Sequence, residues 1–278
     1  MRVQEAYADA LRITRREARN FAWGIMVLPR PKRQAVAALY AFARRVDDIA
    51  DDGSLPPYER RARLESCLAS LETLPHSLDG DSVLVALADA MVRYPIPKQA
   101  LRDLVAGGLM DAERTRYASW EDLEEYCRCV AGAVGLACTA VYGPSDPEAA
   151  AGYAVATGLA LQQINIMRDV PEDWQLGRVY LPQDELARFG VTEDDLADAR
   201  MGPGWRGLME LQAERAEGLL AEGLRLLPLL DPRSALCVRA FAGIYRGLLV
   251  QMRSRGFDVF GERPRLSALG KVRAVRAL

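Results

Sequence analysis

The 278-residue sequence contains little lysine, little histidine and no long hydrophobic stretch. Only Lys32, Lys98 and Lys271 are lysines, and His76 is the one histidine. Five cysteines without a CxxC pair, together with a single histidine, make a zinc site or a disulfide framework unexpected. No run of about 18 uninterrupted apolar residues occurs, so no transmembrane helix is expected. The first 20 residues also lack the apolar stretch of a secretory signal peptide. We therefore expect a cytoplasmic protein with reduced thiols.

The charge balance excludes a further class of function. Lysine and arginine number 36 against 38 aspartates and glutamates, for a net charge of −2. A dedicated nucleic-acid binder usually carries a strongly basic domain, so none is predicted here. All but three of the basic residues are arginines, whose planar guanidinium groups suit phosphate ligands. A GC-rich genome would produce the same bias without any functional cause.

Helical patterns cover most of the chain, and no alternating run of β-branched residues is long enough to predict a strand. The breaks between the helical stretches have the length of loops rather than of linkers. We therefore predict one all-α domain over 1–278, with a basic and flexible tail at about 257–278. The expected helices are 2–20, 31–52, 58–73, 80–93, 97–109, 120–142, 147–173, 205–227 and 232–256.

Two of these helical stretches, 128–142 and 151–167, are apolar on more than one face and rich in alanine and glycine. Helices of this kind lie in the middle of a bundle. Their small side chains allow two interpretations, which composition alone leaves open. Either the helices pack closely against each other, or they leave a cavity for a large apolar ligand.

The first acidic cluster is Asp47-Asp48-Ile49-Ala50-Asp51-Asp52, near the expected end of a helix. Asp47 and Asp51 share one helix face at i,i+4, and such like-charge pairs cost a few tenths of a kcal/mol. The helix dipole also disfavours anions at a C-terminus. A solvated helix end is one explanation. A bound cation, or the neighbouring Arg44, would compensate the repulsion.

The second acidic cluster follows a strongly apolar helix. Steps of three, four and four residues place Gln162, Asn165, Asp169 and Asp173 on one stripe, where uncompensated polar groups are costly. An interhelical hydrogen-bond network explains the amides better than it explains the aspartates. Pro171 removes an amide hydrogen bond to the carbonyl of Met167, so it predicts either a bend or the end of the helix.

Carboxylate and amide oxygens without histidine or cysteine are typical ligands of Mg²⁺ or Mn²⁺. Mg²⁺ usually keeps water ligands and is completed by substrate phosphates. The spacing does not match an EF-hand, and the sequence has no P-loop, GxGxxG or GxSxG motif. The two acidic helix faces could hold Mg²⁺ and a diphosphate between them, with an apolar cavity below for an isoprenoid chain.

YAFARRVDDIADD and QQINIMRDVPEDWQLGRVYLPQDEL together resemble the two signature regions of the squalene/phytoene synthases. The similarity extends from about Asn20-Phe21 to Tyr245, and it implies an all-α isoprenoid-synthase fold. Within the family, ITRREARNFAWGIMVLPRPKRQAVAALYAF looks most like bacterial presqualene diphosphate synthases of hopanoid and squalene pathways. The sequence departs from many relatives at Arg19-Asn20, where they have Ser-Ser or a nearby His, and at Pro171, where glycine is common.

The resemblance implies roles for individual residues. Asp47, Asp48 and Asp51 correspond to the first metal motif, and Asn165, Asp169 and Asp173 to the metal ligands of the second. Asp47, Asp51, Asp169, Asp173 and Tyr126 are the implied catalytic residues. The implied substrate contacts are Phe21, Tyr40, Arg44, Gln162, Asn165, Arg168, Arg178, Tyr180 and Tyr245.

The resemblance further implies a Mg²⁺-dependent prenyltransferase, with Mn²⁺ as a substitute. Two farnesyl diphosphates would condense to presqualene diphosphate and release inorganic diphosphate. The proton would pass to the released diphosphate or through Tyr126. NADPH is not expected in this first half-reaction. Condensation of two geranylgeranyl diphosphates to phytoene, or formation of dehydrosqualene, is the alternative product assignment.

A non-enzymatic alternative is a helical scaffold that binds cations or a membrane surface. Residues 251–278 carry seven basic and two acidic side chains, and such a segment can contact anionic lipid. An exposed terminus explains the same composition. Peripheral contact with the inner face of the membrane therefore remains a hypothesis beside both functions.

Overall fold

The computed structural model describes residues 2–74 and 81–278, except for the side chains of Arg19 and Asn20. His76 lies outside these residues. The described part of the chain is helical, with one isolated β-bridge and no strand. Its elements are α1 (Val3–Glu17), α2 (Arg19–Ile25), α3 (Arg30–Ala50), α4 (Pro57–Thr73), α5 (Ser82–Arg93), α6 (Lys98–Glu113), α7 (Trp120–Cys127), η1 (Arg128–Gly132), α8 (Ala133–Tyr142), α9 (Pro147–Arg168), α10 (Val170–Gln175), α11 (Gln183–Phe189), α12 (Glu193–Ala197), α13 (Trp205–Gly223), η2 (Leu224–Leu229), α14 (Pro232–Ser254) and α15 (Ala268–Arg276).

The predicted all-α class is confirmed, and most of the expected helices occur within a few residues of their predicted bounds. The differences lie in short segments. The helix expected over 2–20 is divided in two, because α1 ends at Glu17 and α2 begins at Arg19. The sequence does not predict α11, α12 or α15. Helices of five to nine residues give too little periodicity to be recognised in sequence.

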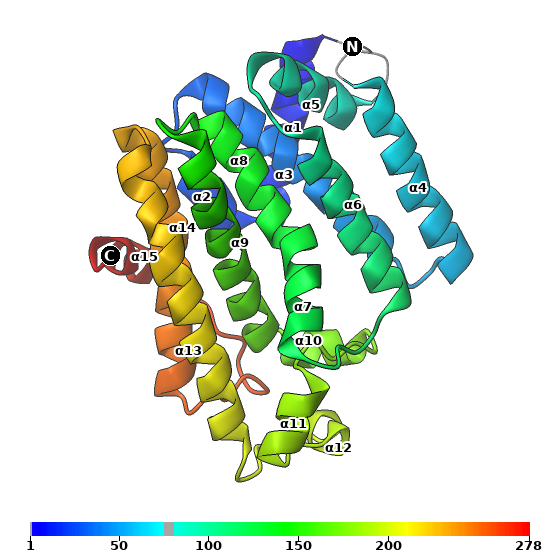
Figure 1. The fold of residues 1–278 in the computed structure, drawn as a ribbon, viewed down its shortest axis with the longest axis vertical. Helices are drawn as coiled ribbons and strands as arrows, with labels where there is room; N and C mark the ends of the chain where they lie inside the picture. Colours follow the sequence, from blue (N-terminus) through cyan, green and yellow to red (C-terminus); the bar gives the residue numbers. More distant parts are fainter. Residues whose placement is uncertain (1, 75–80) are drawn as a thin grey trace.

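The helices form a bundle in which α9 is central (Figure 1). Helix α9 packs against α8 and η1 on one side and against α13 and α14 on the other. Helix α3 packs against α1, α5, α6 and α8. The buried side chains form two main clusters, one mostly from α1–α6 with α8, the other from α7 and α9–α14. Elements distant in sequence therefore meet where the two clusters join.

The alanine- and glycine-rich helices pack closely, and both stretches also contribute side chains to a cavity. A Cβ added at Gly135 would lie 2.3 Å from the carbonyl oxygen of Ala154, and one at Gly158 would lie 2.3 Å from that of Ala131. The backbones of α8 with η1 and of α9 can approach this closely only because these residues have no side chain. Both interpretations of 128–142 and 151–167 therefore hold: their backbones pack closely, and Val130, Gln162 and Asn165 line a cavity.

Two local irregularities shape the interior. Between α7 and α8 the chain forms the π-helical turn η1, an irregularity often found at functional sites. The expected helix 147–173 ends instead at Arg168, and a second helix, α10, begins at Val170 with Pro171 in its first turn. Pro171 therefore marks the helix end, because it has no amide hydrogen with which to continue the α9 ladder.

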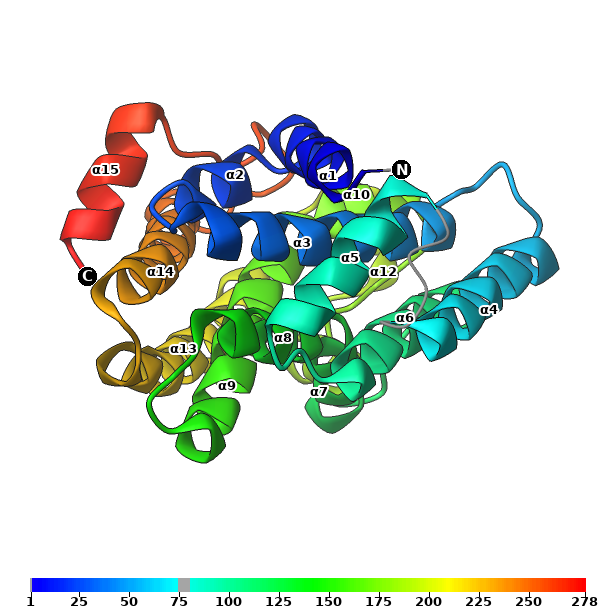
Figure 2. The same ribbon diagram turned by 90° about the horizontal axis from the view of Figure 1, so that it is seen from above.

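The C-terminal segment is not a free tail. Phe257 and Val259 are buried in the core, and α15 packs across α14. Helix α14 is itself long and apolar enough to cross a membrane by length and composition. However, 56% of its most apolar stretch is buried within the bundle, as in a core helix. Figure 2 shows α15 at one edge of the molecule, on the same side of α14 as α2.

Candidate active site

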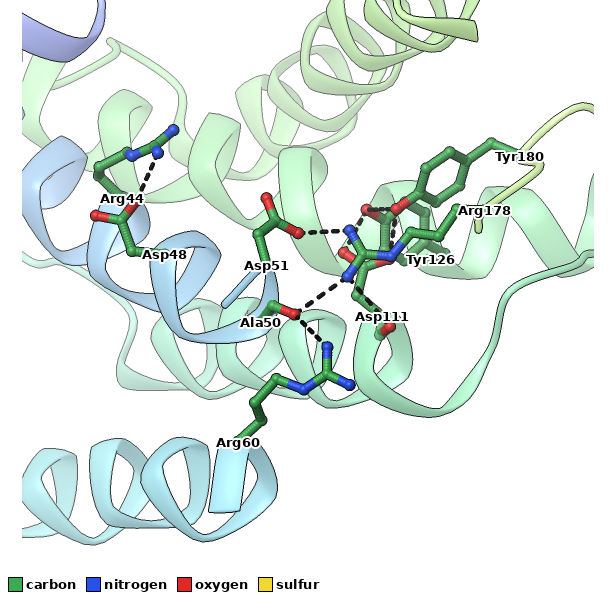
Figure 3. Close-up of polar contacts among 9 residues, drawn as sticks. All are labelled: Arg44, Asp48, Ala50, Asp51, Arg60, Asp111, Tyr126, Arg178 and Tyr180. Atoms are coloured by element: carbon green, nitrogen blue, oxygen red, sulfur yellow. Dashed lines mark hydrogen bonds and ion pairs between the residues drawn. The ribbon is translucent and has the colours of Figure 1, made fainter. Parts of the chain in front are cut away.

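The first acidic cluster lies at the C-terminal end of α3. Helix α3 ends at Ala50, and Asp51 caps it. The guanidinium of Arg178 donates to the Asp51 carboxylate and, over 3.2 Å, to the carbonyl oxygen of Ala50 (Figure 3). Arg60 donates to the same carbonyl oxygen. Two arginines therefore neutralise the negative end of the α3 dipole. This lowers the electrostatic cost of placing an anionic cluster there.

Asp47 and Asp48 point in different directions, although they are adjacent in sequence. Asp47 and Asp51 line a cavity of about 880 Å³, called the central cavity below because it lies between the two acidic clusters. Asp48 instead forms an ion pair with Arg44 at 2.5 Å and lines a separate groove of about 330 Å³. The structure therefore separates Asp48 from the other residues predicted to bind metal, because consecutive residues on a helix are rotated by about 100°.

The second acidic cluster faces the same cavity from the junction of α9 and α10. Asp169 caps the C-terminus of α9, and Asp173 lies in the first turn of α10, where the helix dipole favours an anion. The amide of Asp173 donates to the carbonyl oxygen of Asp169 over 2.9 Å. This bond keeps the two aspartates one helical turn apart, although α9 ends between them. Gln162 and Asn165 continue the stripe along α9.

The predicted site residues therefore converge, with one exception. All of them except Asp48 line the central cavity: Phe21, Tyr40, Arg44, Asp47, Asp51, Tyr126, Gln162, Asn165, Arg168, Asp169, Asp173, Arg178, Tyr180 and Tyr245. The departure predicted at Arg19-Asn20 involves side chains outside the described part of the structure. The cavity brings together segments that are more than 100 residues apart in sequence.

The donor atoms of the cavity fit a hard divalent cation. Carboxylates from α3 and from the α9–α10 junction face one space, and the buried Oδ1 of Asn165 has no hydrogen-bond partner within the described residues. A buried acceptor without a partner is costly unless a ligand satisfies it. Within the described part of the chain, no three acidic, histidine or cysteine side chains converge into a metal cage. The protein therefore offers an incomplete ligand set, which a bound phosphate group would complete.

Burial and mutual repulsion perturb the carboxyl groups of the cavity. The Asp47 side chain is exposed where it lines the cavity, but the surrounding protein desolvates its carboxyl; this desolvation, with the nearby charge of Asp51, raises its pKa to about 7. Burial and the charge of Asp169 raise the pKa of Asp173 to about 8. Titratable groups shifted in this way by desolvation and a charged neighbour are typical of functional sites.

Asp111 is a further acidic residue of the cavity that the sequence did not indicate. The Asp111 carboxylate accepts hydrogen bonds from the hydroxyls of Tyr126 at 2.8 Å and Tyr180 at 2.6 Å (Figure 3). Burial raises the pKa of Asp111 to about 6 and that of Tyr126 well above 10. At neutral pH the carboxyl is therefore mostly ionised, while the tyrosine keeps its proton.

A loop contact places these groups together. Val179 donates its amide hydrogen to the carbonyl oxygen of Thr115, and an isolated parallel bridge joins Arg116 to Val179. This bridge holds Arg178 and Tyr180 against the end of α6, beside Asp111. The only signal for Asp111 in the sequence is one carboxylate after the apolar stretch LVAGGLM, and nothing local connects it with Tyr126 or Tyr180.

Aromatic side chains form an apolar wall next to the acidic groups. Phe21 stacks on Tyr40 and on Phe241, with ring centroids 5.0 Å apart in both pairs. A Cβ added at Gly24 would lie 2.3 Å from the Phe241 ring, so the glycine allows α2 to approach α14. Phe21 and Tyr40 line the cavity, together with Val130 of the π-helical turn.

The arginines of the cavity are engaged to different degrees. Arg178 is buried and contacts Asp51, Ala50 and the backbone of Asp111, so in this structure it positions Asp51. Arg44 pairs with Asp48, but its buried Nε has no partner in the described structure.

Arg168 and Arg263 both pair with Asp169, and Arg263 also reaches Glu172 at 3.2 Å. Arg263 comes from the segment before α15, and no motif in the sequence pointed to it. Asp169 is thus compensated by two cations, whereas the Asp173 carboxylate forms no ion pair with the described residues.

Comparison with known proteins gives matches along almost the whole chain. Residues 14–270 match the family model described as squalene/phytoene synthase. A phytoene synthase from Mycobacterium tuberculosis is 42% identical over 99% of this chain and 91% of its own length. A 15-cis-phytoene synthase from Synechococcus elongatus is 36% identical over 94% of this chain and 88% of its own length.

Solved structures with the same fold include a dehydrosqualene synthase in complex with a ligand, with a TM-score of 0.92 and 30% identity over 99% of this chain and 95% of that one. The squalene synthase HpnC from Alicyclobacillus acidocaldarius has a TM-score of 0.84 and 30% identity over 92% of this chain and 95% of that one.

Proposed function

Because the chain belongs to the squalene/phytoene synthase family, we propose that it joins two prenyl diphosphates head to head and releases diphosphate. The observation that carries this proposal is the convergence of Asp47 and Asp51 with Asn165, Asp169 and Asp173 on one cavity of about 880 Å³. Pockets of about 300–1,000 Å³ are typical of sites for small organic ligands.

The proposed substrate is geranylgeranyl diphosphate, and the proposed product is phytoene. Relatives with the printed name phytoene synthase are 42% and 36% identical to this chain. The second candidate is the one favoured by the sequence motifs, in which two farnesyl diphosphates form presqualene diphosphate. It is supported by the similarity in fold, at 30% identity, to a dehydrosqualene synthase and to the squalene synthase HpnC.

In this proposal the arginines and acidic residues divide the binding of the diphosphate between them. Arg44 and Arg168 would donate to its oxygens, since guanidinium groups bind phosphate through charge-assisted hydrogen bonds. Asp47, Asp51, Asn165, Asp169 and Asp173 would hold Mg²⁺. When bound, Mg²⁺ supplies the positive charge that makes diphosphate a better leaving group. Arg178 would keep Asp51 in place.

The remaining parts of the cavity would control the cation that forms when diphosphate leaves. Phe21, Tyr40 and Val130 would exclude water, which would otherwise capture the cation. A proton must leave a carbon atom during the condensation. The Asp111 carboxylate, with the hydroxyls of Tyr126 and Tyr180 bonded to it, is a base available to accept that proton.

Product analysis tests the proposed function. The purified protein is incubated with Mg²⁺, without NADPH, and with either geranylgeranyl or farnesyl diphosphate. Mass spectrometry of the extract should identify phytoene from the first substrate. Presqualene diphosphate from farnesyl diphosphate, with no product from geranylgeranyl diphosphate, would select the second candidate. Failure of both substrates to release diphosphate would leave the non-enzymatic scaffold as the explanation.

A second expected result concerns the order of metal binding. Because the described acidic groups do not form a metal cage by themselves, calorimetric titration with Mg²⁺ should show weak binding to the empty protein. Addition of the non-hydrolysable farnesyl thiodiphosphate should strengthen it, and Mg²⁺ should strengthen binding of the analogue by the same factor. Tight Mg²⁺ binding that is unaffected by the analogue would indicate a structural cation site instead.

A further inference from the structure

Helices α2 and α15 expose large apolar side chains next to the cavity. Trp23 of α2 and Met26, which caps its C-terminus, are 41% and 51% exposed, while Gly24 and Ile25 face the core. On α15, Leu269 and Val272 are 60% and 37% exposed. We refer to these four side chains and their flanking cations as the α2–α15 face; the cations are Arg33, Lys271, Arg273 and Arg276.

Helix α15 is amphipathic and packs against α14, although none of its residues is fully buried. A Cβ added at Gly243 of α14 would lie 2.8 Å from the Cα of Val275, so α15 packs closely across α14 through this side. Leu269, Val272, Arg273 and Arg276 follow an i, i+3, i+4, i+7 spacing and therefore share the outer side. The helix contains no acidic residue. Its free surface thus combines apolar and cationic side chains only.

At the C-terminal end of α2, exposed apolar side chains lie beside a cation of α3. Arg33 of α3 donates to the carbonyl oxygen of Met26 over 3.4 Å, which places a cation beside the exposed Met26 side chain. Figure 2 shows α2 and α15 on the same side of α14. Both helices pack against α14, so the segments that carry the two apolar pairs lie on one side of that helix.

The α2–α15 face adjoins the rim of the cavity. Ala18, which precedes α2, and Arg265, two residues before the N-cap of α15, both line the cavity. Phe21 lines the cavity from the inner side of α2, while Trp23 faces outward from the same helix. A ligand leaving past this rim would therefore emerge beside the exposed apolar side chains.

We propose that the α2–α15 face docks on an anionic lipid bilayer. Trp23, Met26, Leu269 and Val272 enter the boundary between headgroups and acyl chains, where tryptophan and the apolar side of an amphipathic helix are favoured. The cations bind lipid phosphates, because a negatively charged bilayer attracts basic residues near its surface. Membrane docking rests on the proposed function only for its purpose, which is to deliver an apolar product directly into lipid.

Vesicle binding tests the docking of the full-length protein. It should co-sediment with vesicles of phosphatidylcholine and phosphatidylglycerol, bind pure phosphatidylcholine vesicles at least ~10-fold more weakly, and dissociate as salt is raised. The Leu269→Glu/Val272→Glu variant should bind at least ~10-fold more weakly than the wild type. Val92→Glu is the matched control, because Val92 is 68% exposed on α5, which does not belong to this face, and its binding should be unchanged.

Tryptophan fluorescence gives an independent measurement. Anionic vesicles should shift the emission to shorter wavelength, and Trp23→Phe should remove most of that shift because Trp23 is the exposed tryptophan. Equal binding of the Leu269→Glu/Val272→Glu variant and the wild type would overturn the proposal. So would a protein that forms a dimer through this face and ignores vesicles. Vesicle binding without any product from prenyl diphosphates would contradict the proposed function and leave the docking surface standing.

Discussion

Replacing Asp173 by Asn should lower the turnover number at least ~100-fold and make the empty protein more stable at pH 8. The loss of turnover follows if Asp173 holds Mg²⁺ at the diphosphate, since metal-held charge commonly lowers the barrier by several kcal/mol and each 1.36 kcal/mol is tenfold in rate. The gain in stability follows from the raised pKa of Asp173, which is about 8 in the folded protein.

The sign of the pH dependence is specific. Between its usual pKa near 4 and the raised value near 8, Asp173 binds more proton in the folded state than in the unfolded state. The contribution of Asp173 to the free energy of unfolding therefore decreases as the pH rises from about 4 to about 8. Asn does not titrate, so the Asp173→Asn variant should gain melting temperature relative to wild type at pH 8, by about 2 °C or more. At pH 5 the gain should be smaller.

The measurements are steady-state turnover with saturating Mg²⁺ and thermal melting without divalent cations at both pH values. Asp173→Asn should also lose the rise in melting temperature that Mg²⁺ with diphosphate gives the wild type, because a ligand stabilises only the state that binds it. Glu172→Gln is the control, since Glu172 pairs with Arg263 and does not line the cavity. Retention of both turnover and ligand stabilisation by Asp173→Asn would remove it from the metal site.

Asp47→Asn should lower turnover at least ~100-fold, whereas Asp48→Asn should change it less than ~3-fold, because only Asp47 faces the cavity. The two variants form a matched pair, since Asp47 and Asp48 are adjacent and differ mainly in whether the side chain faces the cavity. Circular dichroism of both variants checks that α3 remains folded. Turnover would be measured over a range of Mg²⁺ concentrations.

The two outcomes of this comparison separate the residue assignments. An equal loss in both variants would restore Asp48 to the metal site that the sequence motif predicted. Near-wild-type turnover of a folded Asp47→Asn protein at saturating Mg²⁺ would contradict the position of the first acidic motif in this site. Asp51 is less suited to such a test, because its replacement would also leave the buried Arg178 without its partner carboxylate.

Local spacing determined much of what this sequence could predict. A helix places residues three and four apart on one face, so the stripe from Gln162 to Asp173 and the pair of Asp47 with Asp51 could be recognised without a structure. Periodicity over long segments likewise predicted α3, α4 and α14 closely. The paired acidic motifs and their resemblance to one family came from the sequence alone.

The tertiary structure decided which of these faces meet. Asp111 joins the site through Tyr126 and through Tyr180, which the bridge between Arg116 and Val179 brings to the end of α6. Helix geometry separates Asp47 from Asp48, but helix packing decided that Asp47 is the one that faces the cavity. Arg263 reaches Asp169 across 94 residues of sequence. Sequence periodicity describes each helix about its own axis, but the rotation of one helix relative to another depends on long-range packing, and packing determines which side chains share a cavity.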